Sequence, residues 1–560
     1  MAQEPTVSFK IDVLIGEEDP IDDRCINIGE SILNAFKSRP DFIGQVDATT
    51  GAENTFQQMR ERSVKCALWL KKLGVQRNDV IIVYSHNHFN TYIPYLATLY
   101  IGAILSVWHE SRIMNLRYFL KKSSPKVIFT DFDKAPCILK IARIMNISTK
   151  IVIFEKKDKK KSKAKSNEIN TFISMVSILN GAFDKTEIDE FSCVELKSSK
   201  DTAMIIFACG VTGLIPKDVV IPHTFFTAPS NQEAPVMVSN DVGLWPASLG
   251  WNISLLLTVR AILSYVKAIK FHRLFDTSDK SHLCNLIEKY KVTWIFLETR
   301  MCFRFPPLYI FKNSDISSLK QVLIGGNPFP NCLYKEFIRA LPNISVIQVY
   351  CLPETGVIAY QRKTEKSAFS VGKNIHLVFV DVKDSLPVKP YKIGVLWCKS
   401  PSLLNAYSIS TTPTKTITDK NGWFHTEDVG YYEPNGNIYI LDRGEHNIKY
   451  KNHHCLVLEY LITCHPGVCT AAVALMWNAS YGEHLMALIV RRKKSKVTEE
   501  ELKQFVAKYS NCMHLRMSVL FAIGLPILQN GFLARKEICK MAAKYLHSKM
   551  PLSGNRETSL

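Results

Sequence analysis

The sequence predicts an α/β protein, with a large N-terminal domain of mainly parallel sheets flanked by helices and a small α+β domain at the C-terminus. Short runs rich in Val, Ile and Phe recur along the chain with helical stretches between them, which is typical of parallel strands buried on both faces. These runs are Val80–Tyr84, Lys126–Thr130, Ile151–Phe154, Thr293–Leu297 and Gln321–Ile324. With 560 residues, the chain is also too long for one ordinary core, so two or more domains are expected.

Three segments can be assigned from individual residues. Phe56–Leu73 has the spacing of an amphipathic helix, and Gly74 directly after it is a common helix C-terminal cap. Thr498 and Glu501 form a capping box that opens a helix in the C-terminal domain. Ile93–Trp108 is the most apolar run, but it is shorter than the ~18 residues that a membrane-spanning helix needs, so a buried core helix is expected.

The composition favours an intracellular protein. Fifteen cysteines are scattered without a C-x-x-C pair or paired spacing, so they are expected to be reduced, mostly buried thiols rather than disulfides or metal ligands. The N-terminus reads M-A-Q-E-P-T-V-S-F-K and lacks the basic start and apolar run of a secretory signal. Secretion is therefore not expected.

Much of the formal net charge of +19 comes from two basic runs, Lys156–Lys165 and Arg491–Lys496. Both follow strand-like segments and are expected to be solvated loops. The alternative is attraction to an anionic membrane surface or to the phosphates of a ligand. No aromatic residues alternate with the lysines and no nucleic-acid-binding module is recognisable, so nucleic acid is not an expected partner.

A loop that suits phosphate binding follows the apolar strand Ala203–Phe207. It reads C-G-V-T-G-L-I-P-K and contains Gly210, Thr212, Gly213 and Lys217. Flexible glycines and a hydroxyl ahead of a lysine suit a loop whose backbone N–H groups surround phosphate oxygens. A plain turn between two buried strands gives the same letters and explains this segment alone equally well. It is not a Walker A loop, because no glycine immediately precedes the lysine and no Ser or Thr follows it.

Further motifs follow in order: I-G-G-N-P at Ile324–Pro328, Q-V-Y-C-L-P-E-T at Gln348–Thr355, N-G-W-F-H-T-E-D through L-D-R at Asn421–Arg443, and I-K-Y-K at Ile448–Lys451. This order closely resembles the adenylate-forming superfamily of acyl-CoA synthetases, luciferases and peptide-synthetase adenylation domains. Within it, the chain is most similar to the insect-type firefly-luciferase and 4-coumarate–CoA ligase branch. The resemblance covers roughly Ile28 to Lys544, nearly the whole chain.

The resemblance implies a two-step reaction that uses ATP, Mg²⁺ and CoA. The carboxylate of a fatty or other apolar acid attacks the α-phosphate of ATP to give acyl-AMP and pyrophosphate, and the thiol of CoA then displaces AMP. The resemblance also implies a large AMP-binding domain over residues 1–441, a hinge at 442–443 and a small mobile domain over 444–560. Rotation about the hinge would let two faces of the small domain serve the two steps.

The resemblance assigns roles to individual positions. Asp428 is expected to bind both ribose hydroxyls, Tyr350 to stack on adenine and Glu354 to help hold Mg²⁺. Lys449 is expected to act in the second step, and Arg443 to support the nucleotide from the hinge. The alternative for Asp428 and Arg443 is a surface salt bridge near a turn.

Other positions are expected to line the ligand. The groups that approach the phosphates and the base are Gly210, Thr212, Gly213, Lys217, Gly325 and Gly326. Thr212 is also expected to face Mg²⁺. The acid pocket is expected between the segments Ser248–Ser254 and Gly325–Pro328, with Gly250 and Trp251 as wall residues. A plain core tryptophan is an equally good interpretation of Trp251.

The chain departs from the motifs of the superfamily. The replaced positions are Cys209 for serine, Val211 for threonine, Asp218 for glycine, Cys351 for glycine, Pro353 for threonine and Glu427 for glycine, and one residue is inserted before Pro216. Val211 removes a hydroxyl donor, and Asp218 adds negative charge where polyphosphate is expected. Pro353 removes both a hydroxyl and a backbone donor.

Phe532 stands at the position of the superfamily's catalytic lysine, in the run L-P-I-L-Q-N-G-F-L-A-R-K. A phenyl ring supplies no cation to the α-phosphate, and loss of one such donor typically lowers the rate by ~10²–10³-fold. Arg535 and Lys536 are nearby cations, but on a helix or turn they would point elsewhere. Two functions stay open: an acid–CoA ligase with impaired adenylation, and a degenerate pseudoenzyme that binds AMP or acyl-CoA.

The last residues also carry a targeting prediction. The chain ends in T-S-L, which resembles the peroxisomal S-K-L signal but lacks its basic middle residue. A peroxisomal or a cytoplasmic location is therefore expected. The final E-T-S-L also fits the C-terminal pattern that PDZ domains bind, and a frayed tail is the alternative.

Overall fold

The computed structural model describes residues 8–10, 12–20, 27–108, 116–154, 172–198, 200–208, 217–247, 249–271, 281–304, 311, 314–326, 329, 331–361, 368–381, 383–403, 417–443, 449–450, 453–463, 465–478, 482–492, 495–509, 517–526 and 533–549. The chain divides into two compact units, and the main part of the second unit begins at Leu441. Each unit is described by itself.

The first unit contains a seven-stranded sheet in the order β11-β10-β6-β5-β7-β8-β9. The strands are β5 (Val80–Tyr84), β6 (Ile104–Val107), β7 (Val127–Thr130), β8 (Lys150–Ile153), β9 (Ile173–Ser174), β10 (Thr202–Ala208) and β11 (Lys217–Pro222). All neighbours are parallel except β10 and β11, which are antiparallel and join across the predicted phosphate loop. Helices cover both faces of this sheet, as the sequence predicts.

A second, fifteen-stranded sheet is parallel from β16 to β3, towards one end of the strand order, and antiparallel elsewhere. The parallel strands are β3 (Ile43–Asp47), β13 (Lys267–Lys270), β12 (Val242–Leu244), β14 (Trp294–Glu298), β15 (Gln321–Gly325) and β16 (Ser345–Leu352). The remaining strands are β1 (Ser8–Lys10), β2 (Val13–Ile15), β4 (Glu53–Thr55), β17 (Gly356–Gln361), β18 (Phe369–Val371), β19 (His376–Val380), β20 (Gly394–Lys399), β21 (Phe424–Tyr432) and β22 (Ile438–Arg443). This large antiparallel part is absent from the sequence prediction.

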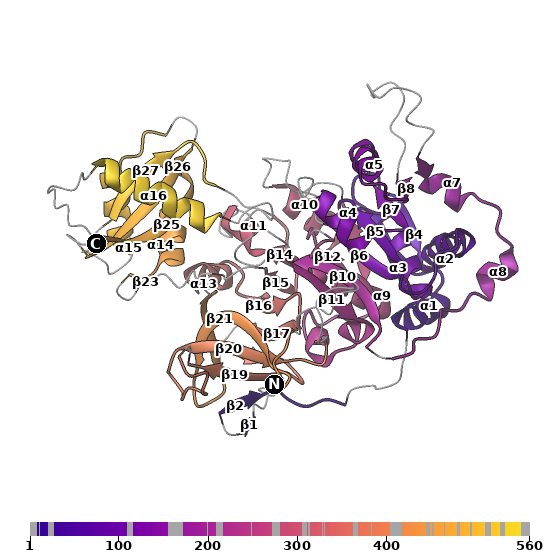
Figure 1. Ribbon diagram of the computed structural model, residues 1–560, viewed down its shortest axis with the longest axis horizontal. Coiled ribbons are helices and arrows are strands. Elements are labelled where there is room, and N and C mark those ends of the chain that lie inside the picture. Colours follow the sequence, from indigo (N-terminus) through magenta and orange to yellow (C-terminus); the bar gives the residue numbers. More distant parts are fainter. Residues whose placement is uncertain are drawn as a thin grey trace. The chain divides into compact units, whose positions relative to one another are not determined.

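Helices link and cover the two sheets (Figure 1). They are α1 (Ile28–Ser38), α2 (Phe56–Lys72), α3 (Tyr92–Tyr100), α4 (Leu116–Ser123), α5 (Ala135–Ile144), α7 (Met175–Leu179), α8 (Lys185–Asp189), α9 (Asn252–Leu263), α10 (Ser281–Tyr290), α11 (Thr299–Arg304) and α13 (Asn331–Ala340), with 3-10 turns η2 (His223–Phe226) and η3 (Pro229–Gln232). Helices α4 and α5 pack on one face of the seven-stranded sheet and α2 and α3 on the other.

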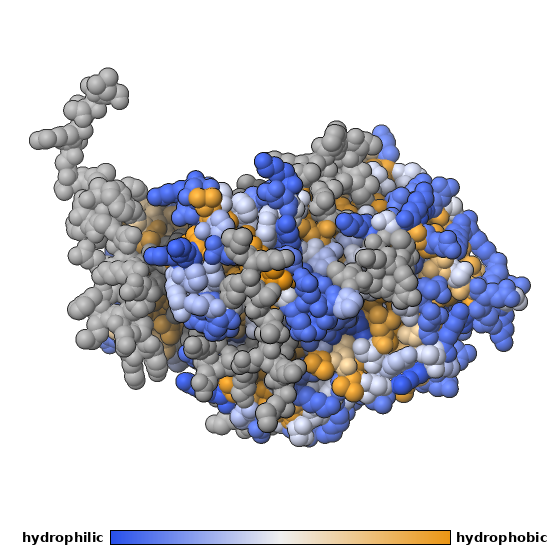
Figure 2. Space-filling model, turned by 90° about the horizontal axis from the view of Figure 1, so that it is seen from below, coloured by the Kyte–Doolittle hydropathy of each residue, from blue (hydrophilic) through white to orange (hydrophobic). Residues whose placement is uncertain are grey.

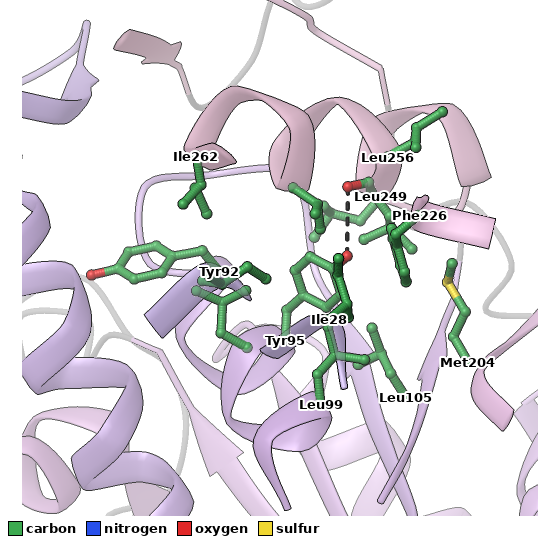
Figure 3. Close-up of a cluster of buried hydrophobic side chains, with 14 of the residues drawn as sticks. Ile28, Tyr92, Tyr95, Leu99, Leu105, Met204, Phe226, Leu249, Leu256 and Ile262 are labelled. Atoms are coloured by element: carbon green, nitrogen blue, oxygen red, sulfur yellow. Dashed lines mark hydrogen bonds between the residues drawn. The ribbon is translucent and has the colours of Figure 1, made fainter. Parts of the chain in front are cut away.

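The largest core combines side chains of both sheets with α1, α2, α3 and α9. Every residue of α9 from Asn252 to Ile262 is buried, which explains its nearly continuous apolar sequence. Figure 3 shows part of this core, to which α3 contributes Tyr95 and Leu99, and α9 contributes Leu256 and Ile262. The Tyr95 hydroxyl donates to the backbone carbonyl of Leu255 at 3.5 Å, so the polar end of the ring is satisfied.

Of the helices predicted at Phe56–Leu73 and Ile93–Trp108, the first is confirmed and the second is wrong. Helix α2 ends at Lys72, and Gly74 after it adopts a φ of +81°, as expected of a C-terminal cap. The apolar run Ile93–Trp108 is not a single helix: α3 ends at Tyr100, Gly102 adopts a φ of +67°, and β6 follows. The glycine allows the chain to reverse into β6, whose backbone is then bonded by its neighbours β5 and β10.

The second unit is a small α+β module. Its strands are β23 (Lys449–Tyr450), β24 (His453–His454), β25 (Val468–Asn478), β26 (Gly482–Arg491) and β27 (Met517–Ala522), and its helices are α14 (Cys455–Thr463), α15 (Glu499–Tyr509) and α16 (Arg535–Lys549). Helices α14 and α15 cover one face of the β25–β27 sheet and α16 covers the other. The predicted capping box of α15 is confirmed, because Thr498 N donates to Glu501 Oε2 at 2.8 Å and Glu501 N donates to Thr498 Oγ1 at 3.2 Å.

The α/β fold class is therefore confirmed. The cysteines whose side chains the structure describes are free thiols. Within the same residues, no helix combines the length and apolar character needed to cross a membrane. On the face drawn in Figure 2, hydrophobic side chains are scattered among hydrophilic ones outside the grey atoms, which is normal for a protein surface. Leu386, Tyr391 and Ile393 are exposed large hydrophobic residues on the loop between β19 and β20.

Candidate functional site

The candidate site lies at the carboxyl ends of the parallel strands in the large sheet. Open α/β sheets bind ligands at this edge, because the loops that leave the strands meet there. Lys270, Glu298 and Gly325 are the last residues of β13, β14 and β15. Tyr350 lies two residues before the end of β16. The predicted base-binding and acid-binding residues thus converge on one edge of one sheet.

The two segments expected to form the acid pocket lie side by side. Gly326 adopts a φ of +113°, and a methyl group added there would lie 3.0 Å from two ring carbons of Trp251. A methyl group added at Gly325 would lie 3.2 Å from the ring of Phe296. Both glycines therefore give space to aromatic rings, and Trp251, which follows Gly250, covers Gly326 directly.

Asp428 is held in a buried position by Tyr350. The Tyr350 hydroxyl donates to Asp428 Oδ2, and Asp428 is only 3% exposed. Its backbone N–H donates to Thr426 Oγ1 at 3.0 Å, and this hydroxyl donates to the Leu396 carbonyl at 2.7 Å. The alternative of a surface salt bridge near a turn is therefore wrong for Asp428, which is a buried acceptor on strand β21.

Two β-bulges set the directions of these side chains. The pairing of β20 with β21 shifts between Val395 and Trp397, opposite the segment that carries Asp428. The pairing of β16 with β17 shifts directly after Tyr350. An extra residue in one strand re-aims the side chains beside it and increases the local twist. The bulges thus account for the meeting of two side chains from strands that are not neighbours in the sheet.

Glu354 lies in a turn that is held by hydrogen bonds with three polar side chains. Asn252 Nδ2 donates to the Leu352 carbonyl at 3.2 Å, and Ser400 Oγ donates to the Thr355 carbonyl at 2.7 Å. Asn231 Oδ1 accepts from the Val357 N–H at 2.8 Å. Glu354 is 7% exposed, so the turn presents a carboxylate that is already largely desolvated.

The charges of Asp428 and Glu354 both affect the pKa of the Cys398 thiol. Burial raises the pKa of Cys398 well above its usual range, and the negative charges of Asp428 and Glu354 raise it further. Burial also raises the pKa of Cys351, beside Tyr350, to about 12. Both thiols are therefore protonated at neutral pH and are poor nucleophiles. The two carboxylates instead define a negatively charged patch beside β20.

Asp218, which replaces a glycine of the superfamily, has a counter-charge. Its carboxylate lies 3.8 Å from Lys122 Nζ on α4, and it is 9% exposed. Its neighbour Tyr118 has a raised pKa, first because of burial and then because of the Asp218 charge. The repulsion of polyphosphate expected from Asp218 is therefore reduced by Lys122.

In the second unit, Arg535 is bound to Glu459. Arg535 Nη2 donates to Glu459 Oε2 at 2.8 Å, and Nη1 donates to the other carboxylate oxygen. Glu459 Oε1 also accepts from the Val473 N–H at 2.6 Å. A bidentate, part-buried pair of this kind fixes the start of α16. This pairing agrees with the expectation that Arg535 would not substitute for a lysine at position 532.

Several predicted residues lie beyond what the structure describes. Gly210, Thr212, Gly213, Phe532 and the C-terminal tripeptide are outside the described residues, as is the basic run Lys156–Lys165. For Lys217, Arg443 and Lys449 only the backbone is described, at the start of β11, the end of β22 and the start of β23. The roles of these residues stay predictions.

The second basic run, Arg491–Lys496, is described in part. Arg491 Nε donates to the Val497 carbonyl at 2.9 Å, and its guanidinium lies 3.4 Å from the centre of the Phe521 ring. Arg492 Nε donates to the Val468 carbonyl at 2.8 Å. These two arginines are therefore exposed but anchored.

The glycine-lined sheet edge and the buried acidic pair define a nucleotide-binding enzyme fold of the adenylate-forming kind. The chain belongs to the AMP-binding enzyme family, which it matches over residues 34–408. It is 27% identical to 4-coumarate:CoA ligase 1 of Petunia hybrida, over 94% of this chain and 95% of that protein. It is 24% identical to luciferin 4-monooxygenase of Photinus pyralis, over 92% and 94%.

Solved structures support the fold. The luciferase-like enzyme from the nonluminescent Zophobas morio mealworm matches with a TM-score of 0.68 and 23% identity, over 77% of this chain and 99% of that chain. The anthranilate CoA ligase AuaEII in complex with anthranoyl-AMP matches with a TM-score of 0.78 and 16% identity, over 92% and 97%. The superfamily recognised from the motifs is thus confirmed, whereas the loss of catalytic groups stays a prediction.

Proposed function

We propose that this protein binds ATP, AMP and acyl-adenylate at the Tyr350–Asp428 pair and is an acyl-CoA synthetase-like protein with impaired adenylation. Its substrate would be a fatty or other apolar carboxylic acid, and its second substrate CoA. The observation that carries the proposal is the buried Asp428 carboxylate, which Tyr350, Thr426 and a β-bulge hold in place. A fixed, desolvated carboxylate is suited to accept two ribose hydroxyls, because it does not have to be reorganised on binding.

The described residues fit an Mg²⁺–ATP ligand. Mg²⁺ prefers oxygen ligands and is usually held by one or two carboxylates together with phosphates and waters. Within the described residues no cluster of three or more His, Cys, Asp or Glu side chains is found, so Glu354 would act with the phosphates rather than in a protein cage. Bound Mg²⁺ would neutralise charge on the polyphosphate. Glu354 would orient it from the clamped turn.

The acid would lie beside the contact that Trp251 makes with Gly326. Its carboxylate oxygen would form a bond to the α-phosphorus while the bond to pyrophosphate breaks. The CoA thiol would then form the thioester, with AMP leaving. In this proposal Lys449 and Arg443 serve the second step and the nucleotide, and Trp251 excludes water from the acid.

Impaired adenylation rests on two features. Phe532 has no charge to place at the α-phosphate, and loss of one such donor costs ~10²–10³ in rate. Arg535, three residues later, is already paired with Glu459. The same features favour the second candidate, a degenerate pseudoenzyme that binds AMP or acyl-CoA without efficient turnover.

Ligand binding tests the proposed site. AMP at about a hundred times its Kd should add ~2.7 kcal/mol to the free energy of unfolding. Asp428→Asn and Asp428→Ala should abolish the AMP-induced rise in Tm, whereas Asp41→Asn, at an exposed aspartate, should leave it unchanged. An AMP response that survives in Asp428→Ala would contradict the site.

Turnover separates the two candidates. Pyrophosphate release should be measured with ATP, Mg²⁺ and a panel of acids, and thioester formation with CoA and a supplied acyl-adenylate. Slow pyrophosphate release with retained thioester formation is expected of the impaired ligase. Loss of both, with AMP still bound, indicates the pseudoenzyme. Pyrophosphate release within tenfold of an ordinary synthetase would contradict impairment.

Location and surface partners stay proposals. We keep a peroxisomal or cytoplasmic location, membrane-surface contact through the basic runs, and PDZ binding through the C-terminus as predictions. Fluorescence microscopy of the chain with and without its last three residues tests the first. Vesicle sedimentation and peptide binding test the others.

A further inference from the structure

Lys270 is a buried lysine without a carboxylate partner among the described residues. It is the last residue of β13 and is 4% exposed. Its Nζ donates to Asn87 Oδ1 at 3.0 Å and lies 4.4 Å from the centre of the Trp245 ring. Asp47 on β3 is the strand-register partner of Lys270 on β13. Its two carboxylate oxygens, however, accept hydrogen bonds from Thr49 N and Thr50 Oγ1. The amine is therefore held by one amide and one aromatic ring.

Several hydrogen-bond donors around this amine have no acceptor within the described residues. A charged lysine has three N–H donors, and Asn87 accepts only one of them. Trp245 and Trp294 stack with ring centres 5.3 Å apart, and neither indole N–H finds an acceptor within the described residues. The orphaned acceptor Gln45 Oε1 lies on β3, in register with Ala268. Buried polar groups normally have hydrogen-bond partners, so these N–H groups without acceptors fit a ligand that supplies acceptor oxygens.

The amine is tied to the wall of the proposed acid pocket. Asn87 Nδ2 donates to the Ala247 carbonyl at 3.1 Å and to Ser254 Oγ at 3.0 Å. These two residues enclose the segment that carries Gly250 and Trp251. The same asparagine therefore bonds the lysine and the segment that covers Gly326.

The sheet register gives the lateral separation of the two strands that end in Lys270 and Gly325. Ala268 pairs with Gly243, Gly243 with Trp294 and Trp294 with Gln321, which places β13 three strands from β15. Lys270 and Gly325 lie an even number of residues beyond Ala268 and Gln321, so they share one face of the sheet. Three strand spacings amount to ~14 Å, a span that an extended acyl chain can bridge.

We propose that Lys270 is a specificity-determining residue that binds a second carboxylate at the far end of the acid, so that the preferred substrate is an elongated dicarboxylic acid rather than a plain fatty acid. This inference rests on the proposed function, because it places the reacting carboxylate beside Gly326. Lys270, with Asn87 as its support, would pair with the distal carboxylate, and the indole N–H groups would supply further donors.

Burial supports this assignment. It lowers the pKa of Lys270 to about 7, so a large share of the unliganded protein carries a neutral amine at neutral pH. An arriving carboxylate favours the charged form, and the amine should then take up a proton.

Calorimetry with matched acids tests the inference. Dodecanoic, ω-hydroxydodecanoic and dodecanedioic acid should be titrated into the full-length chain, with and without AMP, in two buffers of different ionisation enthalpy. The wild-type chain should bind the diacid ~10- to ~100-fold more tightly than dodecanoic acid, the range that one charge-assisted hydrogen bond provides. The hydroxy acid distinguishes a need for charge from a need for any acceptor oxygen. The diacid should also cause net proton uptake.

Variants locate the effect. Lys270→Met should remove both the diacid preference and the proton uptake, and should favour dodecanoic acid. Lys270→Arg keeps the charge and should keep the preference. Lys267→Met, three residues earlier on the same strand and only partly buried, should behave like the wild type.

Each outcome decides the matter. Equal affinity for the two acids, a preference for the hydroxy acid over the diacid, or a diacid preference that survives in Lys270→Met would overturn the inference. Failure of the wild-type chain to bind the diacid overturns it as well, even when AMP binds normally. Loss of AMP binding with an intact diacid preference would count only against the proposed nucleotide function. The proton-uptake measurement on the wild-type chain needs no variant to fold.

Discussion

Glu427 adopts a φ of 65°, in the left-handed backbone region, directly before the buried carboxylate of Asp428. A side chain in this region costs roughly 1–2 kcal/mol, whereas glycine adopts it freely. The superfamily's usual glycine at this position is therefore explained by the bulge, and this chain keeps the bulge with a strained residue.

Replacing Glu427 with glycine should stabilise the protein. Relief of backbone strain exceeds the added chain entropy of glycine in the unfolded state, so Glu427→Gly should gain up to about 1 kcal/mol in the free energy of unfolding. Urea unfolding measures this gain. Glu427→Ala removes the same side chain but keeps the unfavourable φ, so it should give no such gain. Equal stabilisation by alanine would show that the carboxylate, not the backbone, is responsible.

His223 makes stability depend on pH. Burial, and then the nearby Arg77, lower its pKa from 6.5 to about 4, partly opposed by Asp201. The folded protein thus keeps a neutral ring where the unfolded chain binds a proton. Stability is complete above pH 6.5 and should fall by up to about 3 kcal/mol as the pH drops towards 4. Chemical unfolding across this range should show a shallower slope in His223→Leu than in the wild type.

At the scale of elements, the contact of the Gly325–Gly326 loop with Trp251 can be isolated by substitution. Gly326→Ala meets both an unfavourable φ and the Trp251 ring at 3.0 Å. Gly74→Ala meets only an unfavourable φ of +81°, with no atom within 4 Å among those described. Gly326→Ala should therefore cost more than the ~1 kcal/mol expected of Gly74→Ala, and it should weaken acid binding.

A double substitution confirms the cause. Combining Gly326→Ala with Trp251→Leu should recover the part of the loss that comes from the ring. Thermal unfolding of the four variants measures the coupling. Additive effects on thermal unfolding would show that the loop and Trp251 do not interact.

The sequence predicts the strands and the motif residues well, but not the contacts that hold them. Short apolar runs and turn residues are local signals, so β5, β7 and β15 are found almost to the residue. The clamps on the Glu354 turn and on Lys270 join residues 100, 126 and 183 positions apart. Such contacts depend on strand order and on bulges, which no local pattern encodes. Lys270 alone had a signal, as a lysine within an otherwise buried strand.

For the whole molecule, the motif order predicts the superfamily because it requires many positions at once. It also predicts which departures matter. Asp218 illustrates the limit of that approach: its charge looks harmful in the sequence, but Lys122 on a distant helix compensates it. Departures at buried positions therefore have to be judged together with the side chains that surround them.

Restoring the catalytic lysine tests how much of the ancestral activity the whole chain retains. Phe532→Lys returns a cation to the position where the superfamily stabilises the α-phosphate, while the Arg535–Glu459 pair continues to hold the start of α16. Pyrophosphate release should then rise by ~10²-fold or more, because one preorganised donor is worth that much. Phe532→Met changes the ring without adding charge and should leave the rate unchanged. A flat response to lysine, with AMP still bound, would move the defect to the phosphate loop, where the sequence predicts that Val211 removes a donor and that the inserted residue displaces others. The protein would then be a binder that no single substitution returns to catalysis.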